Sequence, residues 1–116
     1  MKERRYPRIA TNLPAKTSFS QGASIEMEVC QLSVGGCKLK GDDLFDTSRM
    51  ENISIKIGNR TIEAKPQPLY CNIKGDDVYF GVAFEKLSLF DTIRLKRFIS
   101  THIANHGAIW PPSLAS

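Results

Sequence analysis

The residues best suited to chemistry in this chain are three arginines near its beginning. Arg4, Arg5 and Arg8 fall within five consecutive positions, in the order Arg-Arg-Tyr-Pro-Arg. Pro7 disfavours helical backbone at the residue before it, so these side chains lie on an extended or turning segment. A guanidinium is a planar fork that grips phosphate oxygens in pairs or reads the O6 and N7 edge of guanine. The segment is therefore a candidate binding site for a phosphate or a guanine base.

A second polar segment comes at the end of a predicted strand. Gln31 and Ser33 supply an amide and a hydroxyl, and Gly35 and Gly36 follow directly. Glycines lack a Cβ, so they offer backbone N–H donors and let a flat ligand approach closely. The alternative is that residues 33–36 form only a turn between two strands. Each of the two segments is weak evidence by itself.

No other pattern in the chain indicates catalysis. His102 and His106 stand four residues apart, a metal-binding spacing, but no third ligand lies nearby in sequence, and histidines at a helix C-terminus more often complement its dipole. Ser33 has no local base, and Cys37 has no histidine before position 102. The chain also lacks a P-loop and a G-x-G-x-x-G motif. We therefore expect no enzyme, no metal and no cofactor.

The net charge of +4 is concentrated at one end of the chain. Residues 1–16 hold five basic residues and one acidic residue, whereas the other hundred residues are balanced. A neutral domain with a basic arm suggests an anionic partner, which is a phosphate-bearing ligand, nucleic acid or a membrane surface. The alternative is a solubilising tail.

Length and composition indicate one soluble domain. The chain has 116 residues, 41% hydrophobic and 24% charged. It has no apolar run of the roughly 18 residues that span a bilayer, and no secretory leader. Cys30, Cys37 and Cys71 form no C-x-x-C pair, which is typical of free thiols buried as small hydrophobes in a reducing compartment. These features predict a cytoplasmic protein without membrane insertion.

Alternating apolar and polar residues predict a mainly β fold. The predicted strands cover about 25–32, 37–40, 53–57, 60–65, 69–74 and 78–84, with a weaker candidate at 15–20. Short strands at this spacing favour a six-stranded antiparallel β-barrel, closed because an open sheet of this size leaves exposed edges. Pro66 and Pro68 cannot donate to a ladder, so they predict an edge, a bulge or a corner.

A C-terminal helix is predicted after the last strand. Apolar residues fall at helical spacing over about 89–104, Ser88 is a suitable N-cap, Asp91 complements the helix dipole, and Gly107 ends the pattern. The chain is thus divided into a basic arm at 1–12, a barrel with its helix at 13–106, and a flexible tail at 107–116.

Together and in this order, these features resemble the PilZ domain family. The family pattern is R-x-x-x-R, then (D/N)-x-S-x-x-G, on a six-stranded antiparallel barrel with a C-terminal helix. Here Arg4-x-x-x-Arg8 is followed by Ser33-x-x-Gly36, and the resemblance covers about residues 3–103. PilZ domains are bacterial receptors for the second messenger cyclic di-GMP.

The resemblance implies a role for each residue of the two motifs. Arg4 and Arg8 would grip phosphate and guanine, with Arg5 as a helper, while Ser33 and Gly36 would belong to the barrel half of the site. The family has Asp or Asn where this chain has Gln31. Glutamine keeps a donor and an acceptor but is one methylene longer and uncharged, which would cost about 1–2 kcal/mol if a carboxylate is required. We expect binding to be retained and weakened.

A mechanism and two alternatives follow. Cyclic di-GMP would fasten the basic arm across the barrel face, and the ordered surface would signal to a protein partner or by self-association, in motility, adhesion or biofilm formation. The first alternative is a PilZ-like protein-interaction adaptor whose nucleotide site is degenerate at Gln31. The second is an unrelated barrel that binds RNA or single-stranded DNA. Nucleic acid is disfavoured because Tyr70 and Tyr79 are the only candidates for a stacking platform.

Overall fold

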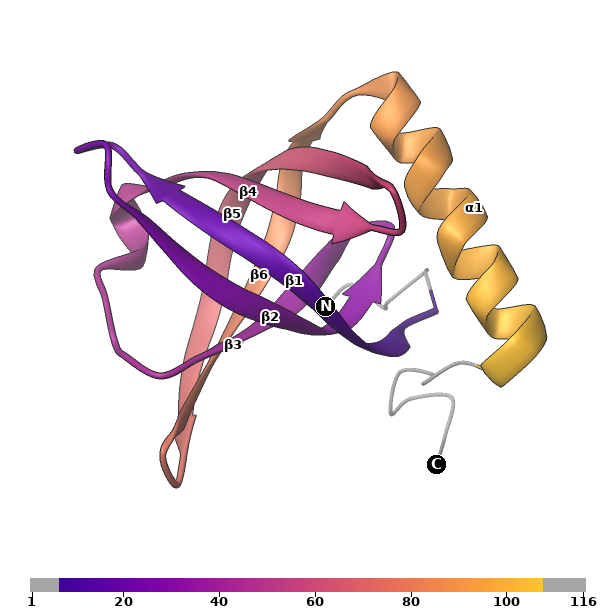
Figure 1. The fold of residues 1–116 in the computed structure, drawn as a ribbon. Coiled ribbons are helices and arrows are strands. Elements are labelled where there is room, and N and C mark those ends of the chain that lie inside the picture. The colour runs from indigo at the N-terminus through magenta and orange to yellow at the C-terminus, as the bar shows by residue number, and fades with distance from the viewer. Residues whose placement is uncertain (1–6, 108–116) are drawn as a thin grey trace, which may run out of the picture.

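Six antiparallel strands close into a barrel, and one helix packs against its side (Figure 1). The structure is a computed structural model, and it describes residues 7–107. The elements are β1 (Ile9–Phe19), β2 (Ser24–Ser33), β3 (Gly36–Gly41), a 3₁₀ turn (Thr47–Arg49), β4 (Met50–Ile57), β5 (Arg60–Lys74), β6 (Asp77–Leu87) and α1 (Leu89–His106). The order around the barrel is β1-β2-β3-β6-β5-β4. The predicted fold class is confirmed.

The first strand is longer than the sequence predicted. The weak candidate at 15–20 belongs to β1, which begins at Ile9 and therefore takes in the end of the arm assigned to 1–12. Burial alternates regularly along β1, but two of its less exposed positions are Thr11 and Thr17, so the apolar alternation is weak in the sequence. Arg4 and Arg5 lie outside the residues that the structure describes, as does most of the predicted tail.

The two strands predicted at 60–65 and 69–74 form one continuous strand, β5. The prolines between them do not end the strand. Instead, the pairing of β5 with β6 shifts register on either side of them, between Lys65 and Pro66 and between Pro68 and Tyr70. The expected bulge is present, and a local change of register accommodates both prolines.

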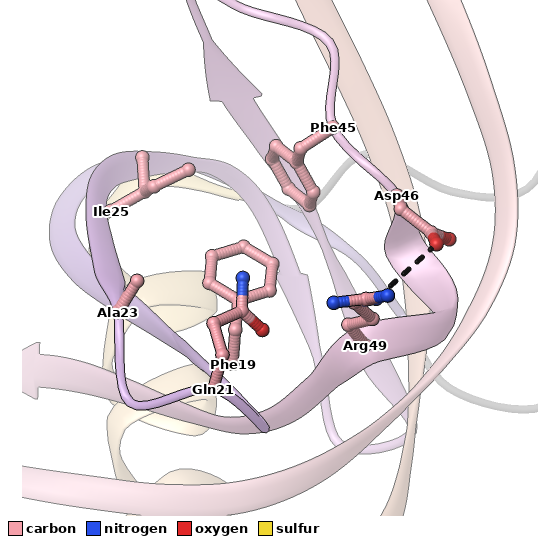
Figure 2. A pocket seen from close by; sticks show the side chains of 7 residues that line it. All are labelled: Phe19, Gln21, Ala23, Ile25, Phe45, Asp46 and Arg49. Carbon is pink, nitrogen blue, oxygen red and sulfur yellow. Dashed lines mark ion pairs between the residues drawn. The ribbon is translucent and has the colours of Figure 1, made fainter.

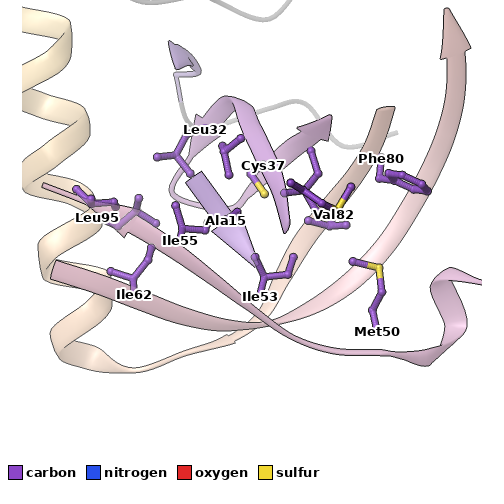
Figure 3. Close-up of a cluster of buried hydrophobic side chains, with 14 of the residues drawn as sticks. Ala15, Leu32, Cys37, Met50, Ile53, Ile55, Ile62, Phe80, Val82 and Leu95 are labelled. Atoms are coloured by element: carbon purple, nitrogen blue, oxygen red, sulfur yellow. The ribbon is translucent and has the colours of Figure 1, made fainter. Parts of the chain in front are cut away.

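The core fills the barrel from end to end (Figure 3). Its largest fully buried side chains come from the inward positions of every strand and include Ile9, Leu32, Ile53, Ile62 and Phe80. Phe45, from the segment between β3 and β4, closes one end. Its ring stacks on Phe80 with centroids 4.4 Å apart and meets Phe19 edge-on at 5.0 Å.

The three thiols lie in different environments. Cys37 is buried in the core, and desolvation raises the pKa of its thiol. Cys30 is half-buried, and burial raises its pKa as well. Cys71 is exposed on β5, so the expectation that all three would be buried is wrong for this residue. Cys71 lies in the part of β5 beyond Ala64, where β4 no longer pairs with it and every residue from Gln67 to Lys74 is exposed.

The helix begins and ends where its capping residues predict. The Ser88 hydroxyl accepts a hydrogen bond from the Asp91 backbone N–H at 3.1 Å, and Gly107 ends the helix with φ of 84°. The Asp91 carboxylate also accepts from the Glu63 backbone N–H at 3.1 Å, which ties the helix start to β5. Leu95 and Ile99 are buried against the barrel. No helix within residues 7–107 is long and apolar enough to span a membrane.

Candidate ligand-binding face

A bulge in β2 turns the second motif outward. Val29 pairs with Leu39 and Gln31 pairs with Lys38, so Cys30 is an extra residue on the β2 side. Val29 and Leu32 are fully buried, which leaves Gln31 on the outer face of the barrel between them. Strict alternation from Val29 would have placed Gln31 in the core. The bulge at Cys30 therefore turns the Gln31 side chain toward solvent.

Arg8 brings the first motif to the second. It forms a bridge immediately before β1, whose pairing of Ile9 with Leu32 places it at the end of β2. The Arg8 Nη1 donates a hydrogen bond to Gln31 Oε1 at 2.8 Å, across 23 residues of sequence. The residue that departs from the family pattern therefore holds the second arginine of R-x-x-x-R. The arrangement fixes a half-buried guanidinium beside a polar turn.

Ser33 organises the turn between β2 and β3. Its hydroxyl accepts from the Gly35 backbone N–H at 3.2 Å and donates to the Gly36 carbonyl at 3.3 Å. The Gly35 carbonyl in turn accepts from the Phe84 backbone N–H at 2.9 Å. This turn is therefore fixed to β6 as well as to its own strands, which makes it a preorganised surface.

Gly36 is required by the barrel itself. A Cβ at this position would overlap the Val82 carbonyl oxygen of β6 and would lie 3.1 Å from the Ala83 Cα. The sequence suggested that the glycines let a ligand approach closely. At Gly36 the missing side chain makes room for a neighbouring strand, and this close approach holds the turn in place.

Two further residues on this face were not singled out as site residues by the sequence. Lys38 stands opposite Gln31 on the neighbouring strand, and its ammonium lies 4.9 Å from the centre of the Tyr79 ring. A lysine over an aromatic face adds a positively charged, stackable surface next to the motif. The only sequence signal for Lys38 was its outward position in the alternation Cys37-Lys38-Leu39.

A separate hollow lies at the opposite end of the barrel (Figure 2). Phe19 and Phe45 form its floor, and Arg49 sits at its rim 3.7 Å from Asp46. Arg8 precedes the start of β1 and Phe19 ends it, so the length of the strand separates the two places. The hollow measures about 130 Å³, well below the roughly 300–1,000 Å³ of ordinary ligand pockets. Its lining among the described residues includes neither Arg8 nor any residue of the second motif.

The two histidines are neighbours on the last turns of α1, with ring centroids 4.8 Å apart. Within the described part of the chain, no three side chains of the His, Cys, Asp or Glu types come together as a metal-binding group. His102 and His106 lie at the C-terminal end of α1, where a positive charge is favoured by the helix dipole.

The fold and the site together define a small barrel domain that presents an arginine beside a serine and glycine turn on its outer face. The chain belongs to the PilZ domain family, because the family model described as the PilZ domain matches residues 2–101. The fold and family predicted from the sequence are confirmed.

Solved structures with this fold come from several bacteria. The inhibitor of motility MotI/DgrA of Bacillus subtilis has 15% identity and a TM-score of 0.74, over 91% of this chain and 54% of its own. MrkH of K. pneumonia in complex with c-di-GMP has 15% identity and a TM-score of 0.71, over 90% of this chain and 53% of its own. The PilZ domain of Escherichia coli YcgR with c-di-GMP has 18% identity and a TM-score of 0.61. The match covers 86% of this chain and 91% of the YcgR domain.

At these identities the likeness establishes the fold alone. The chain spans about half the length of MotI/DgrA and of MrkH. No curated protein sequence gives a significant match.

Proposed function

We propose that this protein is a receptor for cyclic di-GMP and not an enzyme. The ligand binds on the outer face formed by Arg8, Gln31 and the turn at 33–36. The observation that carries the proposal is the 2.8 Å hydrogen bond from Arg8 to Gln31, because it joins the two family motifs into one surface. Membership of the PilZ family, and the c-di-GMP complexes of MrkH and the YcgR PilZ domain, support the choice of ligand.

The chemistry of the face suits a dianionic guanine nucleotide. The Arg8 guanidinium forms paired hydrogen bonds to phosphate or to the O6 and N7 edge of guanine. Ser33 and the backbone of its turn supply further hydrogen-bonding groups, and Lys38 adds a second cation within the same sheet. We propose that ligand binding holds the segment with Arg4 and Arg5 against this face. The resulting surface then signals to a protein partner.

Isothermal titration calorimetry of the full chain tests the ligand. We expect saturable heat with cyclic di-GMP, and none with GTP or with a short single-stranded oligonucleotide. No heat with cyclic di-GMP at high micromolar concentration would overturn the proposal in favour of an adaptor with a degenerate site. Binding of the oligonucleotide alone would instead favour a nucleic-acid barrel.

Gln31 provides a sharper prediction within the same assay. Gln31→Asp should tighten binding by about 0.5–1.5 kcal/mol, because a carboxylate forms a charge-assisted pair with Arg8 or with guanine N–H donors while it also repels the ligand phosphates. Gln31→Ala should weaken binding, because Arg8 loses the acceptor that positions it. Gln21→Ala, at the opposite end of the barrel, is the matched control. Equal affinity for wild type and both Gln31 variants would place residue 31 outside the site.

A further inference from the structure

The second half of β5 forms a free edge of the sheet, with β6 and then β3 paired on its other side. β4 pairs with β5 only from Arg60 to Ala64, whereas β6 pairs with it as far as Lys74. Every residue from Gln67 to Lys74 is exposed. Figure 1 shows the β5–β6 hairpin extending away from the rest of the molecule. No strand among residues 7–107 pairs with the other edge of this segment.

Beyond Pro68, this edge carries no charged side chain until Lys74. Free edges commonly carry lysines or inward-pointing charges, which prevent pairing with another chain. Residues 66–73 contain no charged side chain. Leu69 and Ile73 are instead 61% and 60% exposed, and Tyr70 between them is 39% exposed. Pro66 and Pro68 lack an N–H donor, so they limit any further pairing to the segment from Leu69 onward.

We propose that the edge Leu69–Ile73 pairs antiparallel with the same segment of a second copy of this chain. An antiparallel pair of identical strands has a two-fold axis, so one surface serves both partners. A register centred on Cys71 places Ile73 opposite Leu69 of the second copy, and this contact occurs twice. In this register Lys74 lies just beyond the paired residues, beside Pro68 of the second copy, so the two lysines do not face each other. The uncharged, apolar segment is thus complementary to itself.

This interface is independent of the proposed ligand face. In the barrel order β1-β2-β3-β6-β5-β4, β5 is three strands away from β2 in both directions. Arg8 and Gln31 therefore remain accessible in the dimer. If the protein does not dimerise, the proposal of cyclic di-GMP binding is unaffected. If it does not bind cyclic di-GMP, the proposed dimer is unaffected.

Sedimentation velocity of the full chain over a range of concentrations tests the dimer. We expect Ile73→Lys and Leu69→Lys each to raise the dimer dissociation constant at least tenfold, because lysine loses the apolar contact and adds like charges near the axis. Both side chains are exposed, so the variants should keep the wild-type circular dichroism spectrum. Ile93→Lys, at an exposed apolar position on α1, is the control and should leave association unchanged.

A cross-linking experiment tests the register. Residues paired across an antiparallel ladder have Cα atoms about 4.5–5.5 Å apart, within the span of a short bismaleimide. The wild type and Cys30→Ser should therefore give a covalent dimer, and Cys71→Ser should not. A wild type that stays monomeric at all concentrations would overturn the proposal, as would a dimer that survives both β5 variants or one that Ile93→Lys abolishes.

Discussion

Replacement of Arg8 by alanine should weaken cyclic di-GMP binding at least tenfold, or about 1.4 kcal/mol. The guanidinium is half-buried and held by Gln31 at 2.8 Å, so it is oriented before the ligand arrives. Alanine removes both the charge and the planar fork. The melting temperature should change little, because the Gln31 amide that loses its donor lies on the outer face, where water replaces the hydrogen bond.

Two further variants separate charge from geometry. Arg8→Lys keeps the charge but loses the paired hydrogen bonds, so its affinity should fall between those of wild type and Arg8→Ala. Arg49→Ala removes an exposed arginine at the opposite end of the barrel and should bind like wild type. Arg4→Ala should resemble Arg8→Ala, as the family motif implies. Wild-type affinity for Arg8→Ala in calorimetry would remove this arginine from the site.

Much of the fold could be predicted because its determinants are local. Period-two alternation marks strands wherever one face meets the core, as in residues 53–57 and 78–84. The ends of α1 follow from Ser88 and Gly107, whose capping interactions involve residues no more than four positions away. Each of these features can be recognised within a window of a few residues.

The bulge in β2 could not be predicted, because it depends on pairing with distant strands. Alternation through Met27 and Val29 assigns Gln31 to the core, and only the apolar Leu32 hints that the pattern has shifted. Whether a shift becomes a bulge depends on β1 and β3, which pair with β2 on its two sides. The prolines of β5 did indicate an irregularity, but only its pairing with β6 shows that the strand continues through them.

The candidate site was predictable in its motifs and not in its contacts. Arg8 and Gln31 are separated by 23 residues, and only the closed sheet shows that they touch. Lys38 and Tyr79 come together because β3 pairs with β6, a neighbour that the order of the chain does not reveal. The sequence thus supplied the chemical groups, while the barrel closure determined their neighbours.

The second large effect is expected at Gly36, where alanine should destabilise the fold by about 2–3 kcal/mol. The added methyl would overlap the Val82 carbonyl oxygen, a backbone atom within the pairing of β3 with β6. Relief requires the two strands to separate, which breaks ladder hydrogen bonds. The φ of Gly36 is not in the left-handed region, so the cost is steric and not conformational. The melting temperature should fall by roughly 10 °C.

Gly81→Ala is the matched control, since it adds the same methyl group on the adjacent strand. There the methyl would meet the ring of Tyr70, whose side chain is 39% exposed and can rotate into solvent. We therefore expect a loss smaller than that of Gly36→Ala by at least about 1 kcal/mol, measured by urea denaturation. If Gly36→Ala and Gly81→Ala lowered the free energy of unfolding equally, separation of β3 from β6 would cost no more than rotation of the Tyr70 side chain. In that case the glycine of the second motif would not be explained by strand packing, and a direct role in ligand contact would be the remaining physical reason for it.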